Sequence, residues 1–178
     1  MSALHSAIVA IASSLSLLSL ILIYGLLRRL RALEAQLGDS VPSTPRPGHR
    51  IKDFSVVTVD GATLGRDDLN GPDTIVALLS VGCEACEKIV TELTARPLGV
   101  PVVALIYAGD REAASRLTDT LRRELGDRCR VAVVSHGEVA MAFQVGSFPT
   151  LVRVREGVVR AAGSSLSELE TADAAHVA

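Results

Sequence analysis

The chain begins with a long apolar run. Its first 27 residues contain no Asp, Glu, Lys or Arg, and Ala3 to Leu27 is mostly apolar. Twenty-five helical residues at about 1.5 Å each span roughly 37 Å, which exceeds a hydrocarbon core of about 30 Å. A cleavable signal peptide would carry a basic segment before its apolar core, whereas here Arg28 and Arg29 follow the run. We therefore expect residues 1–38 to form an uncleaved transmembrane helix with a juxtamembrane extension.

An apolar stripe continues beyond this run. Leu26, Leu30, Leu33 and Leu37 keep the three- and four-residue spacing of one helix face until Gly38. The stripe either pairs with a second copy of the chain or lies among lipid headgroups, so the sequence leaves the oligomeric state open.

Residues 39–50 interrupt the apolar patterns. The stretch DSVPSTPRPGHR holds three prolines and no periodic apolar position, which is typical of a stiff, extended linker. We expect the globular domain to occupy residues 51–178.

Within that domain, apolar runs typical of strands alternate with amphipathic segments typical of helices. The expected strands are 54–59, 74–79, 100–107, 131–134, 151–154 and 158–161. The expected helices are 83–95, 110–125, 136–143 and 164–175, with Asp110 as an N-cap candidate and Ser165 to Glu168 as a possible capping box. This order predicts an α/β domain whose central mixed sheet carries helices on both faces.

The overall composition argues against one class of partner. The chain has a formal net charge of −2 and 3% aromatic residues, with no tryptophan. Proteins that bind nucleic acids need a basic surface for phosphates or aromatic side chains on which bases stack. We therefore expect no nucleic-acid partner. Three cysteines are also too few for a disulfide-stapled scaffold, so a close pair of them points to a site.

That pair is Cys83 and Cys86, placed where an apolar strand is expected to end and a helix to begin. Unpaired N–H groups and the dipole at a helix N-terminus stabilise a thiolate, so the pKa of the Cys83 thiol is expected to be lowered. The spacing puts both sulfurs on one helix face, close enough to form and break a disulfide. We expect Cys83 to form a mixed disulfide and Cys86 to resolve it, without any cofactor or resident metal.

Two alternatives remain open for the pair. It could be half of a zinc site completed by Cys129 and His136, or an inert disulfide, although so small a loop removes little entropy from the unfolded chain. Cys129 alternates with Val131 and Val133 on one side of a strand, which favours a packed core thiol over a regulatory one. His136 precedes a helix start and is expected to be a turn residue.

A second motif contains Pro149, which follows Cys83 by 66 residues. Residues 146–150 read Gly-Ser-Phe-Pro-Thr and lead into the expected hairpin LVRVREGVVR. Together with the Cys-x-x-Cys pair, this resembles the thioredoxin superfamily. The lead-in IKDFSVVTVDGATLGRDDLNGPDTIVALLS is similar to the membrane-anchored TlpA-like branch of ResA- and MauD-like proteins. The resemblance covers about residues 51–175.

The resemblance implies a thioredoxin-like fold and a thiol-disulfide oxidoreductase. In that family Cys83 would be the nucleophile, Cys86 the resolving cysteine and Pro149 a cis-proline. Phe148 would then show its backbone to a substrate chain that binds like a strand. The implied partners are cysteine-containing proteins and a membrane thiol-disulfide electron partner.

Three residues depart from the family pattern. Gly82 stands where a tryptophan usually precedes the first cysteine, and Ala77 replaces a buried acid that helps to deprotonate the resolving cysteine. Glu84 lies between the cysteines, where a carboxylate opposes ionisation of a thiol. These changes affect the rate and direction of exchange, which the spacing of the cysteines does not determine. A non-catalytic module that binds a partner or delivers a metal is the main alternative function, and a peroxidase is a weaker one.

Membrane orientation is the subject of two conflicting indications. Three arginines follow the apolar run, which by the positive-inside rule places the domain in the cytoplasm. The resemblance implies the opposite side, where disulfides persist. We expect a single-pass protein of the cytoplasmic membrane, embedded in the lipid bilayer, with an extracytoplasmic domain.

Overall fold

The computed structural model describes Ser16, Ser19 and residues 23–25, 44–109, 111–135 and 137–177. Contacts divide the chain into residues 1–40 and residues 41–178. In the first unit the described residues are helical. No helix built from the described residues is both long and apolar enough to cross a membrane. Most of the expected anchor, and also Asp110 and His136, lies outside the described residues, so those expectations stay predictions.

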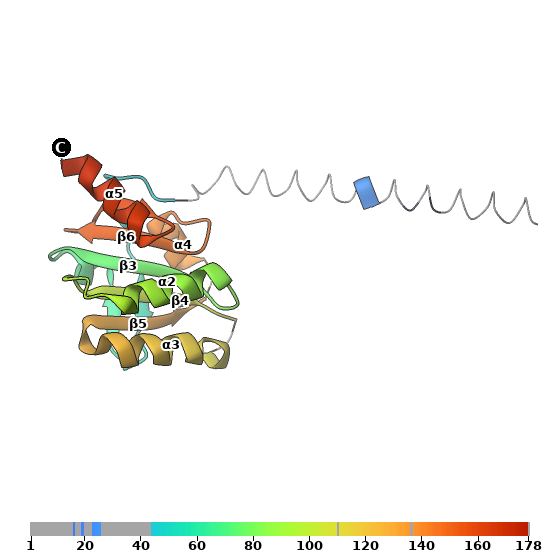
Figure 1. The fold of residues 1–178 in the computed structure, drawn as a ribbon, viewed down its shortest axis with the longest axis horizontal. Helices are drawn as coiled ribbons and strands as arrows, with labels where there is room; N and C mark the ends of the chain where they lie inside the picture. The colour runs from blue at the N-terminus through green and yellow to red at the C-terminus, as the bar shows by residue number, and fades with distance from the viewer. Residues whose placement is uncertain are drawn as a thin grey trace, which may run out of the picture. The chain divides into compact units, whose positions relative to one another are not determined.

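In the second unit the described residues contain a five-stranded sheet in the order β5-β4-β3-β6-β7 (Figure 1). The strands are β3 (Thr74–Ser80), β4 (Val102–Tyr107), β5 (Cys129–Val134), β6 (Thr150–Arg155) and β7 (Val158–Gly163). Strands β3, β4 and β5 run parallel, whereas β6 is antiparallel to β3 and β7 to β6. The expected mixed sheet is confirmed.

Central strand β3 is buried on both faces. Its residues Thr74 to Leu79 are all buried, and Leu78 and Leu79 face opposite sides because side chains alternate along a strand. A strand covered on both faces reads as a continuous apolar run, which is why the sequence alone located it.

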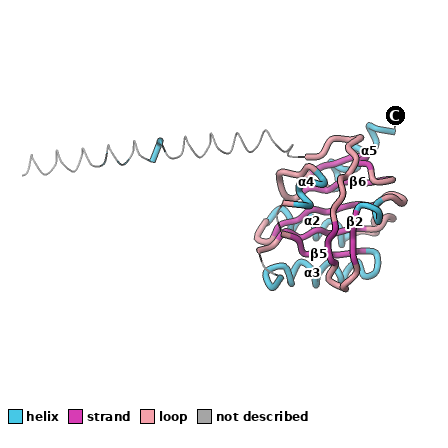
Figure 2. The backbone as a smooth tube through the Cα atoms, turned by 180° about the vertical axis from the view of Figure 1, so that it is seen from behind, coloured by secondary structure: helices cyan, strands magenta, loops and turns pink. Residues whose placement is uncertain are grey.

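Three helices cover one face of the sheet: α2 (Glu84–Ala95), α3 (Arg111–Leu125) and α5 (Leu166–Val177). The other face packs against α4 (Glu138–Phe143), the short helix η1 (Arg66–Leu69) and the hairpin of β1 (Ser55–Val57) and β2 (Thr63–Gly65). Another short helix, η2 (Gly126–Arg128), precedes β5. Figure 2, the view from behind, shows β2 in front of the sheet and α2 and α3 beyond it. The expected covering of both faces is confirmed.

Both edges of the sheet have backbone partners. At β5 the Val59 N–H donates to the Val131 carbonyl at 2.8 Å. At β7 the Gly48 N–H donates to the Val159 carbonyl at 2.8 Å, and the Val159 N–H donates to the His49 carbonyl at 2.9 Å. These bonds protect the edges from pairing with other chains. They also fasten the last residues of the expected linker to the domain.

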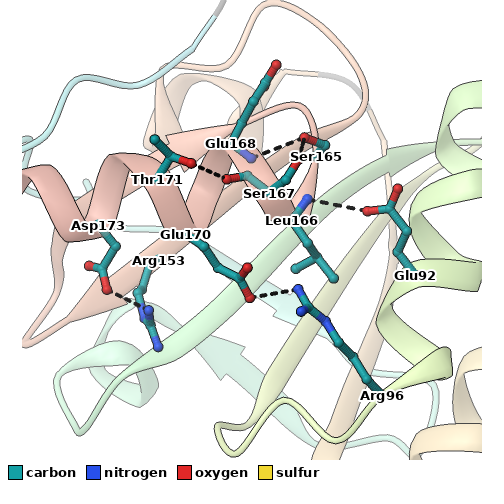
Figure 3. A network of polar contacts seen from close by, with 10 residues as sticks. All are labelled: Glu92, Arg96, Arg153, Ser165, Leu166, Ser167, Glu168, Glu170, Thr171 and Asp173. Atoms are coloured by element: carbon teal, nitrogen blue, oxygen red, sulfur yellow. Dashed lines mark hydrogen bonds and ion pairs between the residues drawn. The ribbon is translucent and has the colours of Figure 1, made fainter.

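The N-terminus of α5 is capped differently from the expected capping box. Ser165 Oγ accepts the Glu168 N–H at 3.2 Å, which is the expected half (Figure 3). The Glu168 carboxylate instead accepts the N–H and the hydroxyl of Ser164, both at 2.7 Å. Those bonds lower the pKa of Glu168. The carboxylate therefore reaches one residue further back than the motif predicts.

Helix α2 is joined to α5 through its C-terminal half, as Figure 3 shows. The Glu92 carboxylate accepts the Leu166 N–H at 3.4 Å, and Arg96 pairs with Glu170 at 2.7 Å. These contacts connect the helix that begins at Cys83 to the C-terminal helix, at the end remote from the cysteines.

Candidate active site

The two cysteines of the pair lie at the start of α2. Strand β3 ends at Ser80, Cys83 is the N-cap residue with extended backbone, and Cys86 lies in the first turn of the helix. The cysteines form a disulfide with their Cα atoms 5.2 Å apart. Cys86 is fully buried, whereas Cys83 is partly exposed. An attacking thiol from solvent therefore reaches Cys83 first.

Backbone N–H groups point at both sulfurs. The Cys86 N–H lies 3.2 Å from Cys83 Sγ, and the Ser80 N–H lies 3.4 Å from Cys86 Sγ. Such donors stabilise negative charge on a sulfur when the disulfide is opened, and the helix dipole acts in the same direction. Each cysteine thus has its own main-chain donor.

The Ser80 donor is available because pairing ends just before it on one side of β3. On the β6 side the last paired residues are Leu78 and Thr150. On the β4 side the Val81 N–H donates to the Tyr107 carbonyl at 3.0 Å, so the Ser80 N–H is not used there. Because β6 begins only at Thr150, the Ser80 N–H is left as a main-chain donor for the buried cysteine.

The second motif forms the loop before β6. The Phe148–Pro149 peptide bond is cis, as the resemblance implied. Pro149 is buried, and the Thr150 hydroxyl donates to the Ser147 carbonyl at 2.8 Å within the loop. Extending the β3–β6 register beyond Thr150 places Pro149 level with Leu79 and Phe148 level with Ser80. The loop therefore lies on the side of the sheet where the Ser80 N–H meets Cys86.

An aromatic pair adjoins this loop. The rings of Phe148 and Tyr107 lie 4.5 Å apart between centroids, at an interplanar angle of 44°. Tyr107 ends β4 and is paired with Ser80, and burial raises its pKa, so its hydroxyl stays protonated. Sequence reasoning missed Tyr107, because only the strand pairing brings it beside Phe148.

Solved structures share this arrangement of elements. The thioredoxin domain of a thiol-disulfide oxidoreductase from Bacteroides vulgatus is 16% identical over 75% of this chain and 99% of that chain, with a TM-score of 0.56. A thio-disulfide isomerase from Thermus thermophilus is 22% identical over 75% of this chain and 98% of that one, with a TM-score of 0.57. A secreted disulfide oxidoreductase of Mycobacterium tuberculosis is 18% identical over 68% and 95%, with a TM-score of 0.52. The chain has the thioredoxin fold.

Sequence comparison adds no closer relative. No protein-family model matches the chain. No curated protein is significantly similar to it. At these identities the likeness establishes the thioredoxin fold, and the activity has to be argued from the chemistry of the site.

The charge between the cysteines has a partner of opposite sign. The carboxylate of Glu84 pairs with the ammonium of Lys88, one helical turn further on, at 2.9 Å. Lys88 partly offsets the effect of the carboxylate on Cys83, and the sequence interpretation did not consider this pair. The four-residue spacing of Glu84 and Lys88 was the signal that could have revealed the pair.

Two other departures from the family pattern lie close to the pair. Ala77 is fully buried in the same apolar cluster as Cys86. Gly82 is exposed with φ +74°, and a Cβ atom placed on it would have no neighbour within 4 Å. The backbone conformation favours glycine here, and the missing tryptophan leaves open space beside Cys83.

Cys129 lies at the opposite end of the parallel strands in this thioredoxin fold. It begins β5 and pairs with Val102, whereas Cys83 follows the far end of β3. Six strand residues separate the two ends by roughly 17 Å. Burial raises the pKa of the Cys129 thiol to about 12. The structure therefore does not bring Cys129 to the pair, and the packed core thiol favoured by the sequence is what it shows.

Proposed function

We propose that the chain is a thiol-disulfide oxidoreductase that exchanges the Cys83–Cys86 disulfide with cysteines of other proteins. The observation that carries the proposal is the pair itself, which lies at a helix start. Cys83 is partly exposed and Cys86 is buried, and each sulfur faces a backbone N–H. The thioredoxin fold supports the proposal, because two solved structures that share it are described as a thiol-disulfide oxidoreductase and a thio-disulfide isomerase.

The first step is attack on the exposed sulfur. A substrate thiolate attacks Cys83 Sγ, the Cys83–Cys86 bond breaks, and Cys86 leaves with the bonding electron pair. The Ser80 N–H stabilises the Cys86 thiolate until a proton arrives.

The second step releases the product. Another thiolate of the substrate attacks the substrate sulfur bound to Cys83, so the substrate gains a disulfide and Cys83 leaves as a thiolate. Two electrons have then passed to the protein. In reverse the reduced pair opens a substrate disulfide, and the relative stability of the reduced protein sets the direction.

The loop before β6 would hold the substrate chain. Pro149 has no N–H, and its ring prevents further pairing at that position. Phe148 then offers its backbone to an extended substrate segment, which would bind like an added strand. The β3–β6 register, extended beyond Leu78 and Thr150, supports a place for both residues on the side of the sheet that carries the pair.

For the cellular setting we propose a single-pass anchor, an extracytoplasmic domain and a membrane protein as electron partner. The uncharged run Ala3 to Leu27 supports the anchor. A disulfide persists outside the cytoplasm, and one structural neighbour is described as secreted. Whole cells are first treated with dithiothreitol to open the disulfide and are then labelled with a membrane-impermeant thiol reagent. Protection of Cys83 until lysis would overturn the extracytoplasmic placement.

The activity is tested by exchanging single sulfurs for oxygen. Cys83→Ser removes the attacked atom and should abolish oxidation or reduction of a cysteine-containing model protein. Cys129→Ser is the matched control and should retain activity, because Cys129 lies at the other end of the strands. Full turnover by Cys83→Ser would contradict the proposal and favour a non-catalytic binding module, whose bound metal an elemental analysis would reveal.

A further inference from the structure

A groove runs between α2 and α3 and ends beside Cys83. The two helices lie next to each other on one face of the sheet (Figure 1). Val90 and Thr91 of α2 and Leu117 of α3 line a hollow of about 310 Å³ between them. Gly82 also lines this hollow, so the hollow reaches the residue that precedes Cys83.

A second hollow continues the first. It has a volume of about 470 Å³ and lies over the carboxyl ends of β3, β4 and β5, where Ser80 and Tyr107 line it. Val81 and Ala113 line both hollows, so these two residues mark where the hollows meet. In sheets with parallel strands, ligands bind outside the carboxyl ends. We call the two hollows together the α2–α3 groove.

The lining of the groove combines an apolar floor with two charged groups. Val90 is buried, and Val81 and Leu117 are partly buried against the core below α2 and α3. Glu87 and Arg116 are exposed at the rim, one from each helix. Neither of them forms an ion pair with any residue that the structure describes. A carboxylate accepts peptide N–H groups and a guanidinium donates to carbonyls, so this rim matches an extended chain.

We infer that the α2–α3 groove binds the substrate segment next to the reactive cysteine and holds one aliphatic side chain of it. The inference rests on the proposed function and adds a specificity surface to it. Because the groove reaches Gly82, a substrate whose cysteine reacts with Cys83 can place a neighbouring side chain in the groove. Gly82 carries no side chain and leaves that entrance open, where a tryptophan would cover it.

Two synthetic peptides provide the probe. Each is an octapeptide with a central cysteine, and the residues two positions away on both sides are leucine in one peptide and serine in the other. The peptide thiolate attacks Cys83 Sγ of the oxidised full-length protein, the Cys83–Cys86 bond breaks, and Cys86 takes up a proton. Mass spectrometry after acid quenching measures the rate of adduct formation. Reaction of each peptide with oxidised glutathione corrects for its own thiol reactivity.

We expect the leucine peptide to react about ten-fold faster than the serine peptide, since one apolar side chain in a pocket gives discrimination of that order. Ala113→Trp fills the groove where its two parts meet and should bring the ratio close to one. Glu112→Trp is the matched control: it adds the same side chain at a neighbouring exposed position outside the groove and should keep the ratio.

A second variant makes the floor polar without adding bulk. Leu117→Gln should slow the leucine peptide several-fold and leave the serine peptide unchanged. A wild-type ratio near one, or an unchanged ratio in both Ala113→Trp and Leu117→Gln, would overturn the groove assignment. Dithiothreitol separates the two proposals: normal reduction with no peptide preference contradicts the groove alone, whereas a disulfide that neither peptide nor dithiothreitol opens contradicts the proposed function as well.

Discussion

The two ends of the parallel strands hold cysteines in opposite environments. At the carboxyl end, Cys83 is partly exposed at a helix start and receives a backbone N–H. At the amino end, Cys129 is buried among apolar side chains, and burial raises the pKa of its thiol. The difference teaches that position relative to a helix N-terminus, more than residue type, decides whether a thiol in this sheet can react.

The largest expected effect is on thiol alkylation. In the reduced protein at pH 8, iodoacetamide should modify Cys83 at least about a thousand-fold faster than Cys129, since a pKa of about 12 leaves almost no Cys129 thiolate. Peptide mapping after timed quenching measures both rates in one sample. Denatured protein is the control, where the two rates should converge. Equal rates in the folded protein would break the comparison.

The next effect concerns stability in alkali. The pKa of Cys129 is raised in the folded protein. The stabilisation that its neutral thiol gives the folded state is therefore complete below its ordinary pKa of about 9 and is lost as the pH rises toward 12. Between pH 8 and 10 this loss is about 1.4 kcal/mol. Urea unfolding of the wild type and of Cys129→Ala should therefore differ less at pH 10 than at pH 8. A difference that does not change with pH would contradict the buried, neutral thiol.

A pair of glycines extends the comparison to the backbone. Gly82, which follows β3, has φ +74°, whereas Gly71, which precedes β3, does not have a positive φ. Both positions have room for a Cβ atom. Gly82→Ala should cost about 1 kcal/mol of unfolding free energy because of the strained backbone. Gly71→Ala should be neutral or slightly stabilising. Equal effects in thermal unfolding would show that conformation does not separate the two sites.

The smallest effects come from ion pairs at the two ends of α2. Arg96→Ala breaks the exposed pair with Glu170 and should lower stability by about 0.5 kcal/mol without altering exchange rates. Lys88→Ala leaves the Glu84 carboxylate unpaired near Cys83 and should slow alkylation of Cys83 a few-fold at neutral pH. Restoration of the rate by adding Glu84→Gln would confirm the cause. A change in exchange rate in Arg96→Ala would contradict the assignment.

The strands and helices of the domain were largely predictable, because the central strands β3 and β4 are continuous apolar runs. The β3 run TIVALLS and the Cys-x-x-Cys that follows it place the site at a strand-to-helix junction, as the structure confirms. The cis bond before Pro149 followed from the resemblance. These features depend on neighbours in sequence.

Features that depend on pairing between distant strands could not be predicted. The Ser80 N–H meets Cys86 only because β6 stops pairing at Leu78, and a main-chain donor leaves no trace in residue identity. Tyr107 reaches Phe148 through the β3–β4 register. The groove beside Gly82 likewise requires α2 and α3 to be adjacent.

The bonds between residues 48–49 and β7 have a mechanical consequence. Gly48 and His49 are fixed to the sheet edge and Pro45 is buried, so residues 44–50 of the expected linker belong to the domain. Five residues, the number from 39 to 43, reach at most roughly 18 Å even when fully extended. In the proposed anchored protein so short a linker would keep the domain within a thin layer above the bilayer. Substrates would then be those proteins whose cysteines pass through that layer.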